Sequence, residues 1–560
     1  MPAPPAAVAY TSLTQRVQLC LEPTSISSPP APGEQLLMPL TAGAGTMSLT
    51  TQPNTLSPTT GMHLHFFVIG NTGAGTIGIV GTNATGGAQT SITYHVPAAP
   101  QSAQGYNEFT TKEAWGTVTA ASITLTTLTP CQIIVYGSFA GKILIPATVE
   151  SEEKIPKHSP PDKRGVLWKN LRVSQLTKGV SIDKFDADLY PDSLYLPYNL
   201  IGAVPVVTTQ PAAPVSLLAA TTKAATMTLT TGLATVPPGM FLIFTLAANS
   251  VAGTIVLSGF DNYGGAASET ITVPATNGPV YSTKRYSSLT SPGANQFTTT
   301  GLSAAGTIAV TAVFAWTYTW TYDGINNIYP YTNSLEIYNG VFGYMLPGTI
   351  ISDGTFDWQK EKEILFTGKG EAQDFCIVGD PTATLGGSNP FATLAQPSQI
   401  PLVSWPATWY IDAGSGTPFT TQDGSMETFK LAIMTGRKWK FSGDGMQRAS
   451  YVTWETQPDF TADATILLPN YQNYVNYFKP NLPMIFGAQF QGNLLGSNGS
   501  TVYYENIQWT LPVKIESFKA DHSKNPTEGV LKLMAEYSTS YLGYAYKCAW
   551  TCQVPPTYTS

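Results

Sequence analysis

The chain has 560 residues, of which 43% are hydrophobic and only 11% are charged. This length corresponds to three or four domains of about 100–200 residues each, and the apolar content excludes a disordered chain. A net charge of −7 excludes a surface built to hold nucleic acid, because such surfaces need clustered lysine and arginine. The five cysteines, odd in number and widely spaced, favour buried thiols over a disulfide framework.

The N-terminal residues, MPAPPAAVAY, carry no basic segment followed by a long apolar run. A secretory signal needs both features. No apolar run in the sequence approaches the ~20 residues that span a bilayer. We therefore expect a protein that is made and kept in a cytoplasm and that has no membrane partner.

An internal repeat is the clearest feature of the first half of the chain. TMSLTT at 46–51 returns as TMTLTT at 226–231, and the repeat extends over three glycines in each copy. These are Gly81, Gly86 and Gly87, matched by Gly259, Gly264 and Gly265. Both copies alternate apolar and polar residues between closely spaced turn residues, which is typical of a β-sandwich. We predict an N-terminal arm or strand at 1–41 and two immunoglobulin-like modules at 42–140 and 206–318.

The segment 141–205 between the modules differs from them in charge. Its stretch EEKIPKHSPPDKRG has three prolines and both charge signs, which favours a long extended loop over a core strand. A solvated linker is the alternative interpretation. The charged residues of this loop are Glu152, Glu153, Lys154, Lys157, Asp162, Lys163 and Arg164. After Trp168 the sequence alternates enough to predict a pair of strands.

The remaining region, 319–560, shows many strand-like runs, no repeat and little helical periodicity, and we predict one β domain there. In the run from Asp357 to Ile364, strand alternation places Asp357, Gln359, Glu361 and Glu363 on one face. The other face takes Trp358, Lys360, Lys362 and Ile364. The acidic residues Asp357, Glu361 and Glu363 are candidates for lining a channel, with a plain solvated strand as the alternative.

The sequence carries little sign of chemistry. A GxGxxG pattern at 73–78 is followed by no helical pattern, and a dinucleotide site needs a helix N-terminus at the phosphate. His63 and His65 lie two apart and share a strand face, where they can bind a metal only with a third ligand. Two structural histidines are the favoured interpretation, and their counterparts in the second copy are Phe241 and Ile243. We expect no enzyme activity, no metal and no cofactor.

Two features together resemble the tail tube proteins of long-tailed bacteriophages. One is the charged arm with its Trp-led strand pair at 151–192, interrupted by an inserted module. The other is the stretch WPATWYIDAGSGTPFTTQDGSMETFKLAIMTGRKWKFSGDG with the later TADATILLPN. The resemblance covers about half of the chain and implies an all-β fold, with tail-tube-type β-sandwich or barrel-forming domains beside the two immunoglobulin-like modules.

The resemblance also implies a function and partners. Subunits of this family close into rings whose sheets join in an inner β-barrel, the rings stack through arms such as 152–164, and DNA passes through the channel without specific binding. The partners would be further copies of the chain and other tail proteins (tape measure, tail terminator, distal tail), and the location would be the tail of a virion. An acidic balance would keep DNA mobile in the channel.

Several alternatives stay open. Without the two modules about 340 residues remain, which is large for one domain. Either six subunits form a ring, or each chain carries two tube folds and three chains form a ring of pseudo-sixfold symmetry. A virion adhesin or distal tail protein that binds host-surface carbohydrate is the main functional alternative. A glycoside hydrolase is a third possibility, with aromatic residues that stack on sugar: Trp405, Trp409, Tyr410, Trp439 and Trp454.

Overall fold

The fold is almost entirely antiparallel β. In a computed structural model, the part of the chain that is described has two helices, α1 (Pro53–Leu56) and α2 (Tyr195–Ile201), and neither is long and apolar enough to cross a membrane. The predicted all-β class is confirmed. The described residues are 16–21, 33–43, 45–56, 61–84, 86–98, 106–128, 130–154, 157–158, 172–173, 179–201, 204–233, 239–261, 264–323, 331–340, 342–359, 362–379, 389–391, 394, 401–402, 407–414, 416–440, 451–467, 476, 478–498, 501–521, 523, 528–537 and 542–556.

The first module is a sandwich of two sheets, ordered β2-β10-β4-β7 and β3-β9-β5-β6, with β8 added beside β5. Its inner face is one apolar cluster centred on Phe66, Trp115 and Ile133. The strands are β2 Gln35–Ala42, β3 Thr46–Met47, β4 Met62–Ile69, β5 Gly75–Thr82, β6 Ala88–Val96, β7 Tyr106–Trp115, β8 Thr117–Val118, β9 Ile123–Thr126 and β10 Gln132–Phe139.

The second module repeats this arrangement strand for strand. Its sheets are ordered β17-β25-β19-β22 and β18-β24-β20-β21, with β23 beside β20. Its inner cluster is centred on Phe244, Tyr286 and Phe297. The strands are β17 Val215–Thr222, β18 Thr226–Thr228, β19 Phe241–Ala247, β20 Gly253–Phe260, β21 Ala266–Val273, β22 Gly278–Tyr281, β23 Ser288–Leu289, β24 Gln296–Thr300 and β25 Thr307–Val313.

The repeated glycines have a geometric cause. A Cβ atom on Gly81 would lie 2.0 Å from the carbonyl oxygen of Thr117, and one on Gly259 would lie 1.9 Å from that of Ser288. In both modules the strands approach too closely at this point for a side chain. The sequence repeat at this position therefore records the same close contact in the same fold.

The two sandwiches lie against a larger β body, which consists of two units. The strands of the first unit come from widely separated parts of the sequence, because both modules are inserted into it. Its strands are β1 Arg16–Leu21, β11 Ile143–Ile145, β12 Ala147–Lys154, β13 Lys157–His158, β14 Arg172–Val173, β15 Gly179–Asp188, β27 Asn333–Tyr338, β28 Gly343–Gln359, β29 Leu365–Ala372 and β30 Cys376–Ile377. α2 follows β15.

The second unit is continuous in sequence. Its strands are β31 Ala407–Ala413, β32 Gln422–Asp423, β33 Met426–Met434, β34 Arg437–Lys440, β35 Tyr451–Trp454, β36 Asp459–Leu467, β37 Met484–Asn498, β38 Thr501–Asp521, β39 Glu528–Ala535 and β40 Tyr546–Cys552. Strands such as β33 and β36 alternate between buried and exposed residues along their length. This alternation is the pattern that predicted them.

The two units repeat the same strand pairings. β1 and β31 each pair with the first strand of a hairpin, β27 or β37. The second strand of that hairpin, β28 or β38, also pairs with the next two strands in sequence, β29 and β30 or β39 and β40. In the first unit β29 pairs with β15, which pairs with β12, and in the second unit β39 pairs with β36, which pairs with β33. A two-stranded ribbon stands in the sequence between β12 and β15, and another between β33 and β36. These ribbons are β13–β14 and β34–β35.

Local geometry matches as well. The carbonyl oxygen of Pro347 accepts a hydrogen bond from Gln373 N at 3.0 Å, and that of Pro512 accepts one from Glu536 N at 2.8 Å. The expectation that 319–560 is one domain without a repeat is therefore wrong. The repeat lies in strand pairing and leaves little trace in residue identity, because a sheet needs only alternation of apolar and polar residues.

One hydrophobic core extends through both units of the body. Trp358 of β28 packs on Trp409 of β31 with ring centroids 5.0 Å apart, and Phe356 packs on Trp509 of β38 at 5.0 Å. Trp409 also contacts Phe429 of β33 at 4.8 Å. Each such aromatic pair contributes about 0.5–1.5 kcal/mol beyond the burial of its area. The two units therefore form one β-sandwich body with shared aromatic packing.

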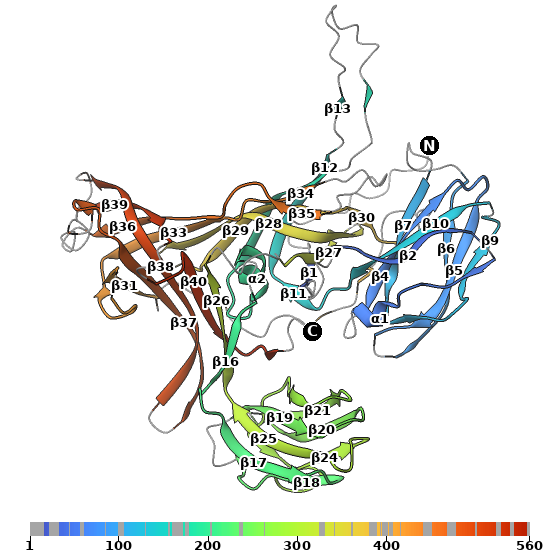
Figure 1. The fold of residues 1–560 in the computed structure, drawn as a ribbon, viewed down its shortest axis with the longest axis horizontal. Coiled ribbons are helices and arrows are strands. Elements are labelled where there is room, and N and C mark those ends of the chain that lie inside the picture. Colours follow the sequence, from blue (N-terminus) through green and yellow to red (C-terminus); the bar gives the residue numbers. More distant parts are fainter. Residues whose placement is uncertain are drawn as a thin grey trace, which may run out of the picture.

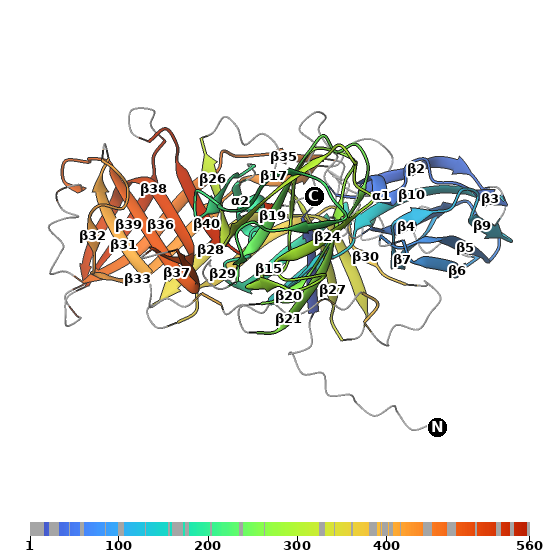
Figure 2. The ribbon, with the colours of Figure 1, turned by 90° about the horizontal axis from the view of Figure 1, so that it is seen from below.

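Figures 1 and 2 show the arrangement: the second unit and the first module lie at opposite ends of the long axis, with the first unit between them. The second module lies to one side and is joined to the body by β16 (Val206–Gln210) and β26 (Ala315–Tyr322), which pair with each other (Figure 1). β26 pairs further with β40. The module boundaries differ from the predicted ones. The first module, predicted at 42–140, begins earlier, with β2. The second, predicted at 206–318, does not include β16 and β26, which belong to the body's sheet.

Candidate functional site

One continuous run of paired strands joins the two units. Eight strands follow one another in it by direct pairing: β12, β15, β29, β28, β33, β36, β39 and β38. We call this the eight-strand ladder. At one end of the ladder β12 pairs with β15, and at the other end residues 514–521 of β38 pair with β39.

A row of charged side chains crosses the outer face of the ladder. Asp357 lies opposite Lys430, Lys430 opposite Asp463, and Asp463 opposite Lys532. The last three are exposed and Asp357 is half-buried. Opposite charges in directly facing positions stabilise a sheet by about 0.2–1 kcal/mol per pair. The acidic face expected around Asp357 is thus part of a charged row in which lysines balance the carboxylates.

The strand that carries Asp357 is shorter than predicted. β28 ends at Gln359, and Lys362 N donates to the carbonyl oxygen of Gln359 at 3.2 Å. Glu363 lies outside β28 and is exposed, and Glu361 lies outside the described residues. Of the three acidic residues β28 therefore carries Asp357, and their role in lining a channel stays a prediction.

The predicted arm begins as a strand and not as a loop. Glu152, Glu153 and Lys154 belong to β12, which pairs with β15 as far as Lys154. Lys157 lies in β13, beyond the end of β12 and away from the body (Figure 1). The other charged residues of the arm, Asp162, Lys163 and Arg164, lie outside the described residues. Contact between rings through this arm stays a prediction.

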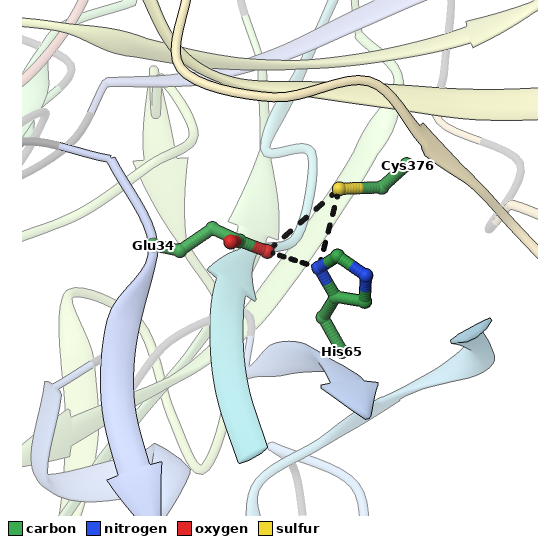
Figure 3. A group of neighbouring side chains, drawn as sticks. All are labelled: Glu34, His65 and Cys376. Atoms are coloured by element: carbon green, nitrogen blue, oxygen red, sulfur yellow. Dashed lines mark hydrogen bonds and ion pairs between the residues drawn. The ribbon is translucent and has the colours of Figure 1, made fainter. Parts of the chain in front are cut away.

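A group of buried ionisable side chains lies where the first module meets the first unit. His65 on β4 has its Nδ1 2.8 Å from Glu34 Oε1, and Cys376 Sγ of β30 lies 3.5 Å from the same nitrogen (Figure 3). The thiol is also 3.7 Å from Glu34 Oε1, and the hydroxyl of Ser138 donates to that oxygen at 3.1 Å. We call Glu34, His65 and Cys376 the docking cluster.

His63 forms a second buried contact beside the docking cluster. Its Nδ1 lies 2.8 Å from the carbonyl oxygen of Thr111, and its Nε2 lies 3.0 Å from Glu336 Oε1 on β27. Gly141 N donates to the same carboxylate oxygen at 2.6 Å. Both ring nitrogens face oxygens that accept, so the ring donates from both and is the imidazolium. The prediction that His63 and His65 share a strand face is confirmed, and both are 2% exposed.

The carboxylates decide the protonation of both histidines. Burial by itself lowers the pKa of each imidazole. The hydrogen bond and charge of Glu336 outweigh burial at His63, and the charge and hydrogen bond of Glu34 do so at His65, so the pKa of both side chains is raised. The first module is therefore held to the body by two buried histidine–carboxylate contacts, and the raised pKa values favour the charged form of both histidines.

The docking cluster does not have the geometry of a nucleophilic site. A base that activates a thiol uses one ring nitrogen for the thiol and the other for an orienting acid. Here Cys376 Sγ and Glu34 Oε1 both contact Nδ1, and all three residues are buried. Thiolate, imidazole and carboxylate are ligands that zinc accepts, so these three residues are the ones that would hold such an ion. Among the described residues, the contacts of the docking cluster join the first module to the first unit of the body.

The second module docks by different chemistry. Phe241 and Ile243, the counterparts of His63 and His65, join the apolar core of the body. The ring of Phe241 lies 4.9 Å from that of Trp316 on β26. Arg285 adds polar contacts, since its Nε donates to the carbonyl oxygen of Gly239 at 2.8 Å. Its Nη1 also donates to Gln553 Oε1 at 3.3 Å, near the end of the body.

A buried carboxyl group, Glu505, and a half-buried one, Asp192, lie near this second junction. Glu505 of β38 accepts hydrogen bonds from Gln553 Nε2 at 2.7 Å and from Asn493 Nδ2 at 2.9 Å. Burial raises the pKa of Glu505 in spite of these donors. Burial and the nearby charge of Glu505 raise the pKa of Asp192 to about 6. The second junction therefore also contains a group that titrates, at lower pH than the histidines of the first.

Sequence reasoning missed the partners of the histidines. Glu34 is 31 residues from His65, Cys376 is 311 residues from it, and Glu336 is 273 residues from His63. No local spacing links residues so far apart. The repeat itself could have indicated this junction. At two positions that face outward from the module, the first copy has His63 and His65 where the second copy has Phe241 and Ile243.

No family of known proteins matches the chain, and no curated protein matches it. Similar solved structures include the exported protein XepA of PBSX, at 11% identity, over 52% of this chain and 94% of that chain, with a TM-score of 0.12. The structure of the Gt strain of infectious bursal disease virus matches at 12% identity, over 67% of this chain and 85% of that chain, with a TM-score of 0.07. TM-scores this low do not establish a common fold, and these similarities carry no argument about function.

Proposed function

We propose that this chain is the structural subunit of a bacteriophage tail tube, which assembles into stacked rings around a channel for DNA and catalyses no reaction. The observation that carries the proposal is the eight-strand ladder, which runs through both repeated units of the body. Ladders of several copies placed side by side would enclose a barrel. Copies that contact one another head-to-tail form a ring where the rotation between them closes.

The outer face of the ladder suits a channel wall. One face of the ladder packs on the core of the body, and the other exposes the charged row of Asp357, Lys430, Asp463 and Lys532. With its charges alternating in sign, this row offers DNA no continuous strip of positive charge. A wall of this kind would let the phosphate backbone slide past without holding it.

The repeated units favour one of the two ring compositions left open by the sequence. The family that the chain resembles builds its ring from six tube folds. Because each chain carries two units with the same strand pairings, three chains would supply six. The β13–β14 ribbon, which lies away from the body, would reach the adjacent ring, and the assembled tube would join other tail proteins in a virion.

Electron microscopy of the purified chain tests this function. We expect negatively stained samples at high protein concentration to show long tubes with a regular axial repeat. Discrete small oligomers that bind bacterial cells would favour an adhesin instead. A stable monomer that forms neither rings nor tubes at any concentration would contradict the proposal.

A further inference from the structure

Three side chains of the kinds that bind zinc meet where the first module joins the body. They are the carboxylate of Glu34, the imidazole of His65 and the thiol of Cys376 (Figure 3). The sequence indicated a histidine pair that lacked a further ligand. The fold supplies His65 with two possible ligands, from 31 and 311 residues away. Carboxylate oxygen, imidazole nitrogen and thiolate sulfur are the donor atoms of protein zinc sites.

We propose that Glu34, His65 and Cys376 bind one zinc ion, which links the first module to the first unit of the body. The ligand atoms are Glu34 Oε1, His65 Nδ1 and Cys376 Sγ. The site would be structural rather than catalytic, because all three residues are buried. The inference goes beyond the proposed function and does not depend on it, since the three ligands belong to a single chain.

The three ligand atoms are spaced like ligands of one ion. Cys376 Sγ lies 3.5 Å from His65 Nδ1 and 3.7 Å from Glu34 Oε1, and tetrahedral zinc bonds of usual length separate such pairs by about 3.5 Å. His65 Nδ1 and Glu34 Oε1 are 2.8 Å apart, the distance of a hydrogen bond, and would move apart slightly around an ion.

A single ion can reach all three atoms at once. Given their three separations, the point equally far from all of them lies about 2.0 Å from each, which is the length of a zinc–nitrogen or zinc–oxygen bond. The longer zinc–sulfur bond, about 2.3 Å, requires only a small outward movement of the thiol. The ligands therefore need little rearrangement to bind the ion.

Exchange of protons for the ion leaves the charge of this buried place unchanged. In the metal-free chain, an imidazolium, a carboxylate and a neutral thiol sum to zero. Zinc ligands are deprotonated, so binding releases one proton from His65 Nδ1 and one from Cys376 Sγ. Zn²⁺ with a carboxylate and a thiolate is again neutral, which avoids burial of a net charge. The ion pair of His65 with Glu34 belongs to the metal-free chain, so measurements on that pair require a chelator.

Neighbouring contacts hold the ligands in position. Glu34 N donates to Gln373 Oε1 at 2.7 Å, which ties the carboxylate ligand to the segment that leads to Cys376. Gly33 permits this approach, because its φ is +86° and a Cβ atom there would lie 2.1 Å from Gln373 Oε1. The hydroxyl of Ser138 donates to Glu34 Oε1 at 3.1 Å. Outer contacts of this kind orient metal ligands, and the hydroxyl or a water molecule would take the fourth position.

The second module shows that attachment alone does not require these residues. Ile243 stands at the place of His65 and packs in the apolar core of the body. Apolar packing is therefore enough to attach a module of this fold. A metal site explains why a thiol, an imidazole and a carboxylate converge at the first junction.

The metal content of the purified full chain tests the site. The chain is treated with a chelator under reducing conditions, incubated with Zn²⁺ in excess Mg²⁺, and separated from free ions by gel filtration. Mg²⁺ competes for exposed carboxylates but not for thiolate and imidazole. We expect elemental analysis to find one zinc ion per chain, and the melting temperature to rise with zinc concentration. A folded wild-type chain that retains no zinc would overturn the proposal.

Substitutions locate the ion. Cys376→Ser and His65→Ile should each weaken zinc binding by more than about 100-fold, because loss of an outer-shell partner alone costs about 10–100-fold. Two matched controls should keep the ion. Cys131→Ser changes a buried thiol in the core of the same module, and His63→Phe changes the neighbouring histidine, which contacts Glu336 instead. Unchanged binding by Cys376→Ser, or an equal loss in the controls, would rule out this site.

A Co²⁺ spectrum of the wild-type chain adds a test that does not depend on the folding of any variant. Cobalt accepts the same sulfur and nitrogen ligands as zinc, and a thiolate bound to it gives an intense charge-transfer band in the near ultraviolet. We expect this band on addition of Co²⁺ to the metal-free chain, and its loss when Zn²⁺ displaces the cobalt. Binding of cobalt without a thiolate band would place the ion elsewhere and contradict the role of Cys376.

Discussion

The two immunoglobulin-like modules have the same strand order but attach to the body by opposite chemistry. In the first, His63 and His65 point out of β4 and form buried ion pairs with Glu336 and Glu34. In the second, the counterpart positions on β19 hold apolar residues that enter the body's core beside Trp316. The inner clusters of both modules are apolar. The comparison teaches that the core of a module sets its fold, while a few outward residues on one strand set how it is attached.

The largest effect is expected from giving the first module the residue of the second. His65→Ile removes the imidazolium and leaves the carboxylate of Glu34 buried without its partner. Such a change costs about 3–5 kcal/mol. Chemical denaturation measures the loss, and adding Glu34→Gln should recover part of it because the buried charge is then gone. A loss below about 1 kcal/mol, typical of exposed pairs, would contradict a buried ion pair.

The reverse exchange is expected to cost somewhat less. Phe241→His replaces a packed ring beside Trp316 by a smaller polar one that faces Arg285 and, among the described residues, no carboxylate placed like Glu336. Lost packing and an unsatisfied polar group together cost about 2–4 kcal/mol. Thermal unfolding of the full chain measures it, with Phe241→Leu as the control that keeps the site apolar. Equal stability of the two variants would show that polarity does not distinguish the junctions.

The first junction should weaken as the pH rises, whereas the second should not. The pKa of His63 and His65 is raised in the folded chain, so above the unfolded value of about 6.5 the folded state binds more protons than the unfolded state. The stabilisation is complete below about pH 6.5 and is lost as the pH passes the folded values, by at most about 1.4 kcal/mol per pH unit for each histidine.

Hydrogen exchange of each module at about pH 7 to about pH 9, corrected for intrinsic rates, distinguishes the two junctions. Asp192 stays constant in this window, because with a folded pKa of about 6 its stabilisation is already lost once the pH has risen above that value. The double variant His63→Phe with His65→Ile should lose the pH dependence of the first module. A wild-type profile that is flat in both modules would contradict the assignment of two imidazolium ions.

The smallest effect should be the same in both modules. Gly86 and Gly264 have φ values of +85° and +79°, and a Cβ atom on either would meet nothing within 4 Å. Alanine at either position would suffer backbone strain alone, about 1 kcal/mol. Melting temperatures of the two single variants measure this cost. A clear difference between them would mean that the modules differ in their turns as well as in their docking.

The repeat of the two modules is visible in the sequence because it rests on geometry that only certain residues satisfy. Gly81 and Gly259 stand where strands approach too closely for a side chain, so the match survives in residue identity. The duplicated units of the body had no such requirement. Their shared features are strand pairings, which many alternating sequences satisfy, so the repeat was invisible in the sequence.

The candidate site was predictable only in part. The alternation around Asp357 correctly separated it from the buried Trp358, but the charged run did not indicate that β28 ends at Gln359. The histidines were found, and their partners were not, because Glu336 and Cys376 reach them only through the folding of distant strands. Lys430 and Lys532 likewise lie in one row with Asp357 only because of the register of the sheet.

The central claim is that this chain completes its ladder with copies of itself. The most direct measurement is the mass and symmetry of the purified assembly, by native mass spectrometry of single rings together with averaged electron micrographs viewed down the tube axis. The account predicts closed rings of three chains with six similar wall segments around one channel. Rings of six chains would contradict the ring of three chains in which each chain supplies two wall segments, and a species of one chain at every concentration would contradict the account as a whole.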